Sequence, residues 1–167
     1  MHNRRIRIAA VGDQLLAGAG DARAIGWWGE ASRRFSEETE NRLVVALSDA
    51  YLDLEATSTA RSRLNLANVL DTASQRNIPV LVVGPTPTLD EQRNARLAEL
   101  NAAYLDVADR RNHVYVDTFT PLVGHEQWRA DLASGQGRPG QAGHGLIAWL
   151  VLHRGWYQWL GLPEPTA

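Results

Sequence analysis

The chain has 167 residues, with 17 basic side chains against 19 acidic ones and a net charge of −2. This length is typical of one domain with a real hydrophobic core, and the near-neutral charge argues against sequence-independent nucleic-acid binding. Cysteine is absent, which excludes disulfides, thiolate metal sites and a thiol nucleophile. All the basic residues are arginine, so the absence of lysine excludes Schiff-base chemistry and a P-loop lysine.

The sequence shows no targeting or membrane-spanning segment. The apolar run Ile8–Val11 is far shorter than a signal-peptide core of about 7–15 residues. The longest apolar run, Leu146–Leu152, falls well short of the roughly 20 residues that cross a bilayer. We therefore expect a cytoplasmic protein without a membrane partner, with one domain over residues 1–160 and a C-terminal tail over 161–167.

Strand-like runs alternate with helical patterns along the chain. The expected strands are Arg5–Val11, Leu43–Ser48, Val80–Gly84 and His113–Asp117. The expected helices are Trp27–Glu38, Thr59–Arg76, Asp90–Arg111, a short one at His125–Leu132, and Pro139–Leu152. Asp90 is typical of a helix N-cap. This alternation predicts an α/β fold, a three-layer α/β/α sandwich with a short parallel sheet of about four strands.

The expected strands differ in how apolar they are. Leu43–Leu47 and Val80–Val83 are continuous apolar runs, as in strands that are covered on both faces. Arg5–Ile8 and His113–Asp117 alternate polar and apolar residues, which is typical of strands with an exposed side. We therefore expect the first and last strands near the edges of the sheet and the other two at its centre.

Polar segments follow the expected strands, and open α/β sheets bind ligands at the carboxyl ends of their strands. Five segments of the chain, in the right order, resemble the blocks of the GDSL, or SGNH, hydrolase family. They are Val11–Gly18, Trp27–Gly29, Val82–Pro87, Tyr115–Leu122 and Ala133–His144. The resemblance runs from about Arg5 to Leu152 and implies the flavodoxin-like fold of that family.

The resemblance implies a serine hydrolase, but other residues stand at the triad positions. In the family a serine attacks an ester carbonyl, a histidine takes its proton, and an aspartate orients the histidine. Here Gln14 stands at the serine position and Arg138 at the histidine position. The aspartate position falls on Gln136 with a one-residue gap, or on Gly135 without it. A carboxamide is not a nucleophile, and a guanidinium cannot act as a base near neutral pH.

The resemblance also implies an altered oxyanion hole. In place of the Gly-x-Asn-Asp of the family, Ser48 takes the glycine position, Ala50 the asparagine position and Tyr51 the aspartate position. The stretch between Trp28 and Leu43 is too short for the second strand of the family, its oxyanion glycine and the helix that follows. We therefore expect this second strand to be lacking, which would leave the first strand at an edge.

No alternative catalytic group or cofactor site stands out in the sequence. Ser134 is expected to be a loop or cap residue, and His144 a partly exposed helical residue rather than a displaced base. Asp13, Asp49 and Asp53 lack the spacing of metal ligands. We therefore expect neither a metal nor another cofactor.

Three functions remain open. The first is a domain that has lost the triad and binds a polar or anionic small molecule, or a protein partner, without ester hydrolysis. The second is a non-serine enzyme of isomerase or cyclase type in the same cleft, and the third is a divergent ester or acyl hydrolase. The expected cleft residues are Asp13, Gln14, Ser48, Ala50, Tyr51, Gln136 and Arg138. The C-terminal aromatic residues Trp149, Trp156 and Trp159 are expected either to pack in the core or to form an exposed patch that meets another subunit. A homodimer through this patch or through the exposed first strand is one expected assembly.

Overall fold

The computed structural model describes residues 6–12, 40–47 and 57–166. The strands are β1 (Arg7–Val11), β2 (Asn41–Ala46), β3 (Val80–Val83) and β4 (Val114–Val116). The helices are α2 (Thr59–Gln75), α3 (Glu91–Asp109), α4 (Thr120–Val123), α5 (Glu126–Ser134), α6 (Gln141–Val151) and α7 (Tyr157–Leu160), with a π-helical turn η1 (Leu152–Trp156) before α7. The helix expected at Trp27–Glu38 lies outside the described residues.

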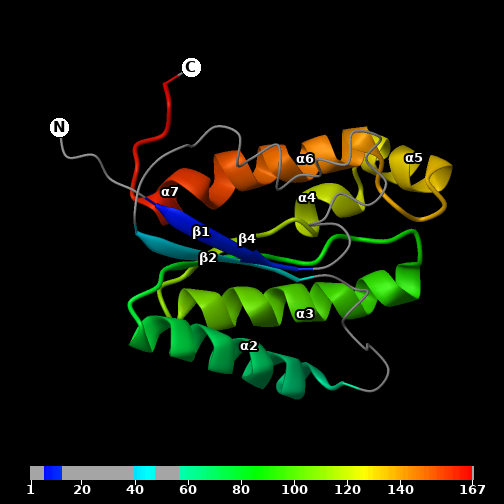
Figure 1. Ribbon diagram of the computed structural model, residues 1–167. Helices are drawn as coiled ribbons and strands as arrows, with labels where there is room; N and C mark the ends of the chain where they lie inside the picture. Colours follow the sequence, from blue (N-terminus) through cyan, green and yellow to red (C-terminus); the bar gives the residue numbers. More distant parts are fainter. Residues whose placement is uncertain (1–5, 13–39, 48–56, 167) are drawn as a thin grey trace.

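The strands form one parallel sheet in the order β1-β2-β3-β4. Ala9 of β1 lies opposite Leu43 of β2, and Leu43 lies opposite Val80 of β3. Helices α2 and α3 cover one face, and α6, η1 and α7 cover the other (Figure 1). The predicted three-layer sandwich is therefore confirmed, and within the described residues the first and last strands lie at the edges of the sheet.

The sheet separates two hydrophobic clusters. Alternate residues of β3 serve both: Leu81 faces the α6 side with Trp156, whereas Val82 faces the α2 side with Leu70 and Tyr104. All of β3 is buried, which matches its continuous apolar sequence because each of its two sets of side chains meets a layer of helices.

Polar side chains cap the helices that follow β2 and β3. Ser58 caps α2 by accepting a hydrogen bond of 3.1 Å from the backbone N–H of Arg61. Asp90 caps α3 by accepting bonds of 2.9 Å and 3.1 Å from the N–H groups of Gln92 and Arg93. These caps satisfy N–H groups that have no partner inside the helix, and the predicted N-cap at Asp90 is confirmed.

The last helix differs from the prediction of Pro139–Leu152 at both ends. It begins at Gln141, with Gly140 as its N-cap, and the chain stays helical through η1 and α7 to Leu160. This continuation buries Trp156 completely and leaves Trp159 only 3% exposed. Both therefore pack in the core and do not form a surface patch.

Trp149 is the C-terminal aromatic residue that lies at the surface. Its side chain is 52% exposed, and its ring stacks on that of His153 with centroids 4.3 Å apart. The prediction of a homodimer through an aromatic patch therefore depends on Trp149 alone, and it remains a prediction.

Candidate functional site

The candidate site lies at the carboxyl ends of the parallel strands. Gly12, Leu47, Gly84 and Asp117 follow the four strands, so the segments after them leave from the same edge of the sheet. Helix α5 and the start of α6 also lie at this end of the molecule (Figure 1). Among the described residues, the site is therefore bounded by the exits of β3 and β4 and by the α5–α6 loop.

The exit of β3 is held by side chains from the segments that follow β4. The hydroxyl of Thr118, which is fully buried, donates to the carbonyl oxygen of Gly84 at 2.7 Å. The indole N–H of Trp128 in α5 donates to the carbonyl oxygen of Pro87 at 3.2 Å. Both bonds satisfy carbonyl oxygens of the irregular segment that follows β3. The first joins this segment to the exit of β4, and the second joins it to helix α5.

The exit of β4 is held by an acidic side chain with structural partners. One oxygen of Asp117 accepts bonds of 2.9 Å from the N–H groups of both Phe119 and Thr120. The same oxygen accepts a bond of 3.1 Å from the amide of Asn101, whose carbonyl oxygen accepts from the hydroxyl of Tyr115 at 2.6 Å. Burial, together with the charge of Asp117, raises the pKa of Tyr115 well above its usual value. This network therefore fixes the backbone at the exit of β4, and the Tyr115 hydroxyl keeps its proton near neutral pH.

The α5–α6 loop closes helix α5 with a Schellman motif. The N–H of Gly137 donates to the carbonyl oxygen of Leu132 at 2.8 Å, which is the bond that defines this motif. Between them Gln136 adopts the left-handed conformation, with φ of 55°. Glycine or asparagine usually occupies this position, so the backbone holds Gln136 in a conformation that its own side chain disfavours.

Asp131 joins the two helices that flank this loop. Its carboxylate accepts bonds of 2.6 Å from the N–H of Gly140 and 2.8 Å from the N–H of Gly143. A negative charge at a helix N-terminus is favourable because it complements the helix dipole and satisfies free N–H groups. Sequence reasoning missed this residue, since Asp131 lies in the preceding helix and no local capping pattern marks it.

The structure describes two of the predicted cleft residues. Gln136 and Arg138 both lie on the α5–α6 loop with exposed side chains. The other predicted cleft residues lie outside the described residues: Asp13, Gln14, Ser48, Ala50 and Tyr51. The structure therefore tests neither their positions nor their grouping with Arg138.

The backbone leaves no room for a side chain at Gly135, which takes the aspartate position in the ungapped alignment. A Cβ atom at Gly135 would collide with the carbonyl oxygen of Arg138 and lie 3.2 Å from that of Asp131. An aspartate at position 135 would therefore require a different loop. Gln136, the position given by the gapped alignment, has an exposed side chain.

The structure corrects the expectation for His144 and refines that for Ser134. His144 is fully buried in α6, because this face of the first turn packs inward. Ser134 is the last residue of α5, and its hydroxyl donates to the carbonyl oxygens of Ala130 and Asp131 at 3.1 Å. The Ser134 hydroxyl is thus used within its own helix, and His144 belongs to the buried face of α6.

Two kinds of feature are absent from the described residues. No three His, Asp or Glu side chains there gather in a way that could hold a metal ion. No helix in that part of the chain is long and apolar enough to cross a membrane.

Comparisons with known proteins give one matching family model and one similar solved structure. The family model for the GDSL-like lipase/acylhydrolase family matches residues 16–146, a span that begins just after Gln14. The crystal structure of the lipase/acylhydrolase from Enterococcus faecalis is similar with a TM-score of 0.57 and 17% sequence identity, over 98% of this chain and 100% of that chain. At that identity the likeness shows the fold alone. No curated protein matches the chain significantly.

Proposed function

Because this chain belongs to the GDSL-like lipase/acylhydrolase family, we propose that it keeps the site of the family as a binding cleft and has lost its Ser-His-Asp chemistry. In this proposal the cleft binds a small polar molecule or anion at the carboxyl edge of the sheet. Gln136 and Arg138 provide its contacts from the α5–α6 loop, and Gln14 stands where the attacking serine would be.

The observation that carries this proposal is the contrast between Arg138 and His144. Arg138 stands at the position where the resemblance expects the catalytic histidine, and its side chain is exposed. His144, the nearest histidine that follows it in α6, is fully buried. A guanidinium stays protonated near neutral pH and cannot accept a proton from a nucleophile. The loop therefore presents a permanent cation in place of a general base.

The charges around the loop favour an anionic ligand at Arg138. Within the described part of the chain Arg138 forms no ion pair. The nearby carboxylate of Asp131 is engaged by the backbone N–H groups of Gly140 and Gly143. The planar guanidinium can form paired hydrogen bonds to a carboxylate or phosphate, so Arg138 is suited to bind either group.

The strained conformation of Gln136 supports the same assignment. Among the described residues, the other two non-glycine residues with positive φ are Asn77 and Asn112, and asparagine tolerates this conformation. Gln136 has no such tolerance, and its side chain is exposed. Strained residues cluster at functional sites, so we assign Gln136 a contact with the ligand.

The first experiment tests whether hydrolysis is lost. The full chain is incubated with short p-nitrophenyl esters and with a serine-directed fluorophosphonate probe, followed by mass spectrometry. We expect no turnover above buffer and no labelled serine. Turnover that the probe blocks, with label on Ser48 or Ser134, would instead establish a divergent ester hydrolase.

The second experiment tests the role of Arg138 in binding. Inorganic phosphate and acetate are titrated into the ¹⁵N-labelled protein, and the amide signals of the α5–α6 loop are followed by NMR. We expect saturable shifts that Arg138→Ala abolishes and that Arg129→Ala, which removes an exposed arginine from α5, leaves intact. Equal binding by the two variants would refute the assignment of Arg138.

A further inference from the structure

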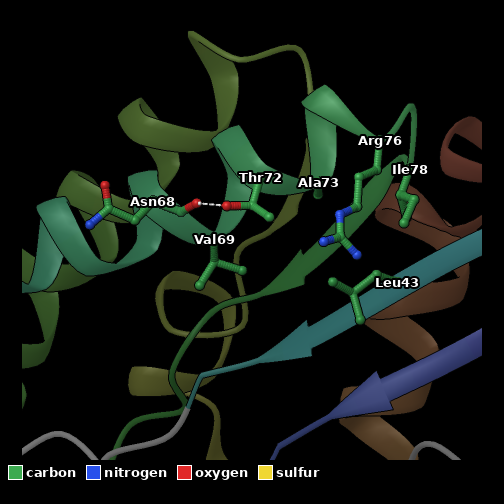
Figure 2. Close-up of a pocket in the computed structure, with 7 residues that line it drawn as sticks. All are labelled: Leu43, Asn68, Val69, Thr72, Ala73, Arg76 and Ile78. Carbon is green, nitrogen blue, oxygen red and sulfur yellow. Dashed lines mark hydrogen bonds between the residues drawn. The ribbon is translucent and has the colours of Figure 1, made fainter.

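A pocket lies on the α2 face of the sheet, near the amino ends of β2 and β3. Its volume is about 430 Å³, within the range of roughly 300–1,000 Å³ that is usual for small-molecule sites. The residues that line it are Leu43, Asn68, Val69, Thr72, Ala73, Arg76 and Ile78 (Figure 2). They come from β2, from α2 and from the turn before β3, so this pocket is separate from the α5–α6 loop. We refer to it as the α2 pocket.

The lining of the α2 pocket is mainly apolar. Leu43 and Ile78 are half-buried, Ala73 is buried, and Val69 is 45% exposed on the side of α2 that borders the pocket. The hydroxyl of Thr72 donates to the carbonyl oxygen of Asn68 at 2.9 Å (Figure 2). The Thr72 donor is therefore satisfied within the helix, and the pocket favours an apolar group over a polar one.

One charged side chain lies at the edge of the α2 pocket. Arg76 is the C-cap of α2, and its guanidinium extends from the end of the helix toward Leu43 (Figure 2). Arg63 of the same helix pairs with Asp106 at 2.5 Å, whereas Arg76 forms no ion pair within the described residues. The pocket thus combines an apolar interior with an unpaired cation at its edge.

We propose that the α2 pocket binds an amphipathic carboxylate, with the apolar body of the ligand against Leu43, Val69 and Ile78 and its carboxylate on Arg76. Burial of the apolar body supplies most of the affinity. The charge-assisted bond to the guanidinium selects an acid over a neutral molecule of the same shape. This inference does not depend on the function proposed for the loop that carries Arg138.

The test uses decanoate, at concentrations below those at which it forms micelles, and the full chain. Binding is measured by calorimetry and by NMR shifts of the amides of residues 68–78. We expect saturable binding that Arg76→Gln weakens about tenfold or more, as expected for loss of a hydrogen bond to a charged group. The matched control is Arg61→Gln, which removes the same charge from an exposed position near the start of α2 and should leave binding unchanged.

Two further measurements separate this ligand from other occupants. Val69→Trp should block the pocket and abolish binding, while circular dichroism shows an intact fold, because Val69 is partly exposed. Decanol should bind at least about tenfold more weakly than decanoate. The proposal is overturned if Arg76→Gln has no effect, if decanol binds equally well, or if the wild type shows no saturable binding. It is also overturned if the pocket is the interface of a dimer that Val69→Trp dissociates.

Discussion

The carboxylate of Asp131 accepts a hydrogen bond of 2.6 Å from the backbone N–H of Gly140 and so joins helix α5 to the first turn of α6. Gly140 is the N-cap of α6 and has no side chain with which to cap the helix. A carboxylate from the preceding helix therefore caps α6 by accepting from the free N–H groups at its start. Since Arg138 lies between the two joined residues, this bond also restricts the loop that carries it.

We expect Asp131→Ala to lower the free energy of unfolding by about 1–2 kcal/mol, the usual effect of losing a helix cap. Urea denaturation measures this change. Glu164→Ala, which removes an exposed carboxylate from the C-terminal segment, is the control and should change stability by less than about 0.5 kcal/mol. Equal stability of the two variants would contradict the capping role of Asp131.

Gln136→Gly should stabilise the protein and weaken binding at the loop. Glycine adopts the left-handed conformation without strain, and relief of that strain is opposed by the larger freedom of glycine in the unfolded chain. We expect a net gain of about 0.5 kcal/mol in urea denaturation. The affinity for phosphate or acetate should fall in the same variant because the side chain is lost.

Asn77→Gly is the matched control for this substitution. Asn77 has the same positive φ of 55°, but asparagine tolerates it, and residue 77 lies in the turn before β3. Its substitution should give a smaller gain in stability and leave anion binding at the loop unchanged. A larger gain at position 77 than at position 136 would show that Gln136 is not strained.

The strands and helices could be predicted from the sequence because each is marked by a local pattern of residues. The continuous apolar run at Val80–Val83 marks a strand buried on both faces, and the structure buries every residue of it. Asp90 directly precedes the helix that it caps. The length of the last helix was predicted less well, since its continuation to Leu160 depends on contacts with the sheet that no local pattern records.

The candidate site could be predicted less well, because it depends on contacts between elements that no local pattern records. The sequence placed Arg138 in the segment just before the last helix, and the structure has it there, exposed on the α5–α6 loop. The role of Asp131 depends on a bond to Gly140 in another helix, which no spacing predicts. The burial of His144 depends on which face of α6 packs inward, and its short distance in sequence from Arg138 did not reveal this.

His113 gives a pH-dependent contribution to stability. Its Nδ1 accepts a bond of 3.1 Å from the N–H of Val80, and its Nε2 lies 2.8 Å from the hydroxyl of Ser74. Because Nδ1 is an acceptor, the ring is neutral with its proton on Nε2. Burial lowers the pKa of His113, and the charge of Arg111 acts in the same direction, although the carbonyl group of Leu70 and the charge of Asp71 oppose them.

The sign follows from proton binding by the two states. With the folded pKa below the unfolded value of about 6.5, the unfolded chain binds more protons as the pH falls through that value. The contribution of His113 to the free energy of unfolding is therefore present above about pH 6.5 and is lost as the pH falls toward the folded pKa.

Urea midpoints at pH 7.5 and 5.5 measure this loss of stability. In His113→Asn, whose amide oxygen can accept from Val80 without titrating, the difference between the two midpoints should shrink. An unchanged difference would contradict the role of His113.

The close approach of η1 to the sheet requires glycine at position 155. A Cβ atom there would lie 2.8 Å from Cγ2 of Val116 and 2.9 Å from Cγ1 of Val114, both in β4. We therefore expect Gly155→Ala to lower the free energy of unfolding by about 1–3 kcal/mol through overpacking. The α6 layer should separate slightly from β4, and this is measurable as faster amide exchange in β4.

Gly145 provides the matched control in the same continuous helical segment. A Cβ atom at this position would meet nothing within 4 Å, so Gly145→Ala carries no steric cost. Alanine is also favoured over glycine inside a helix by about 0.5–1 kcal/mol, so this variant should be more stable than the wild type by that amount. The two substitutions are chemically identical and opposite in expected sign. If both substitutions destabilise the protein, the cost of Gly155→Ala cannot be assigned to the contact between η1 and β4.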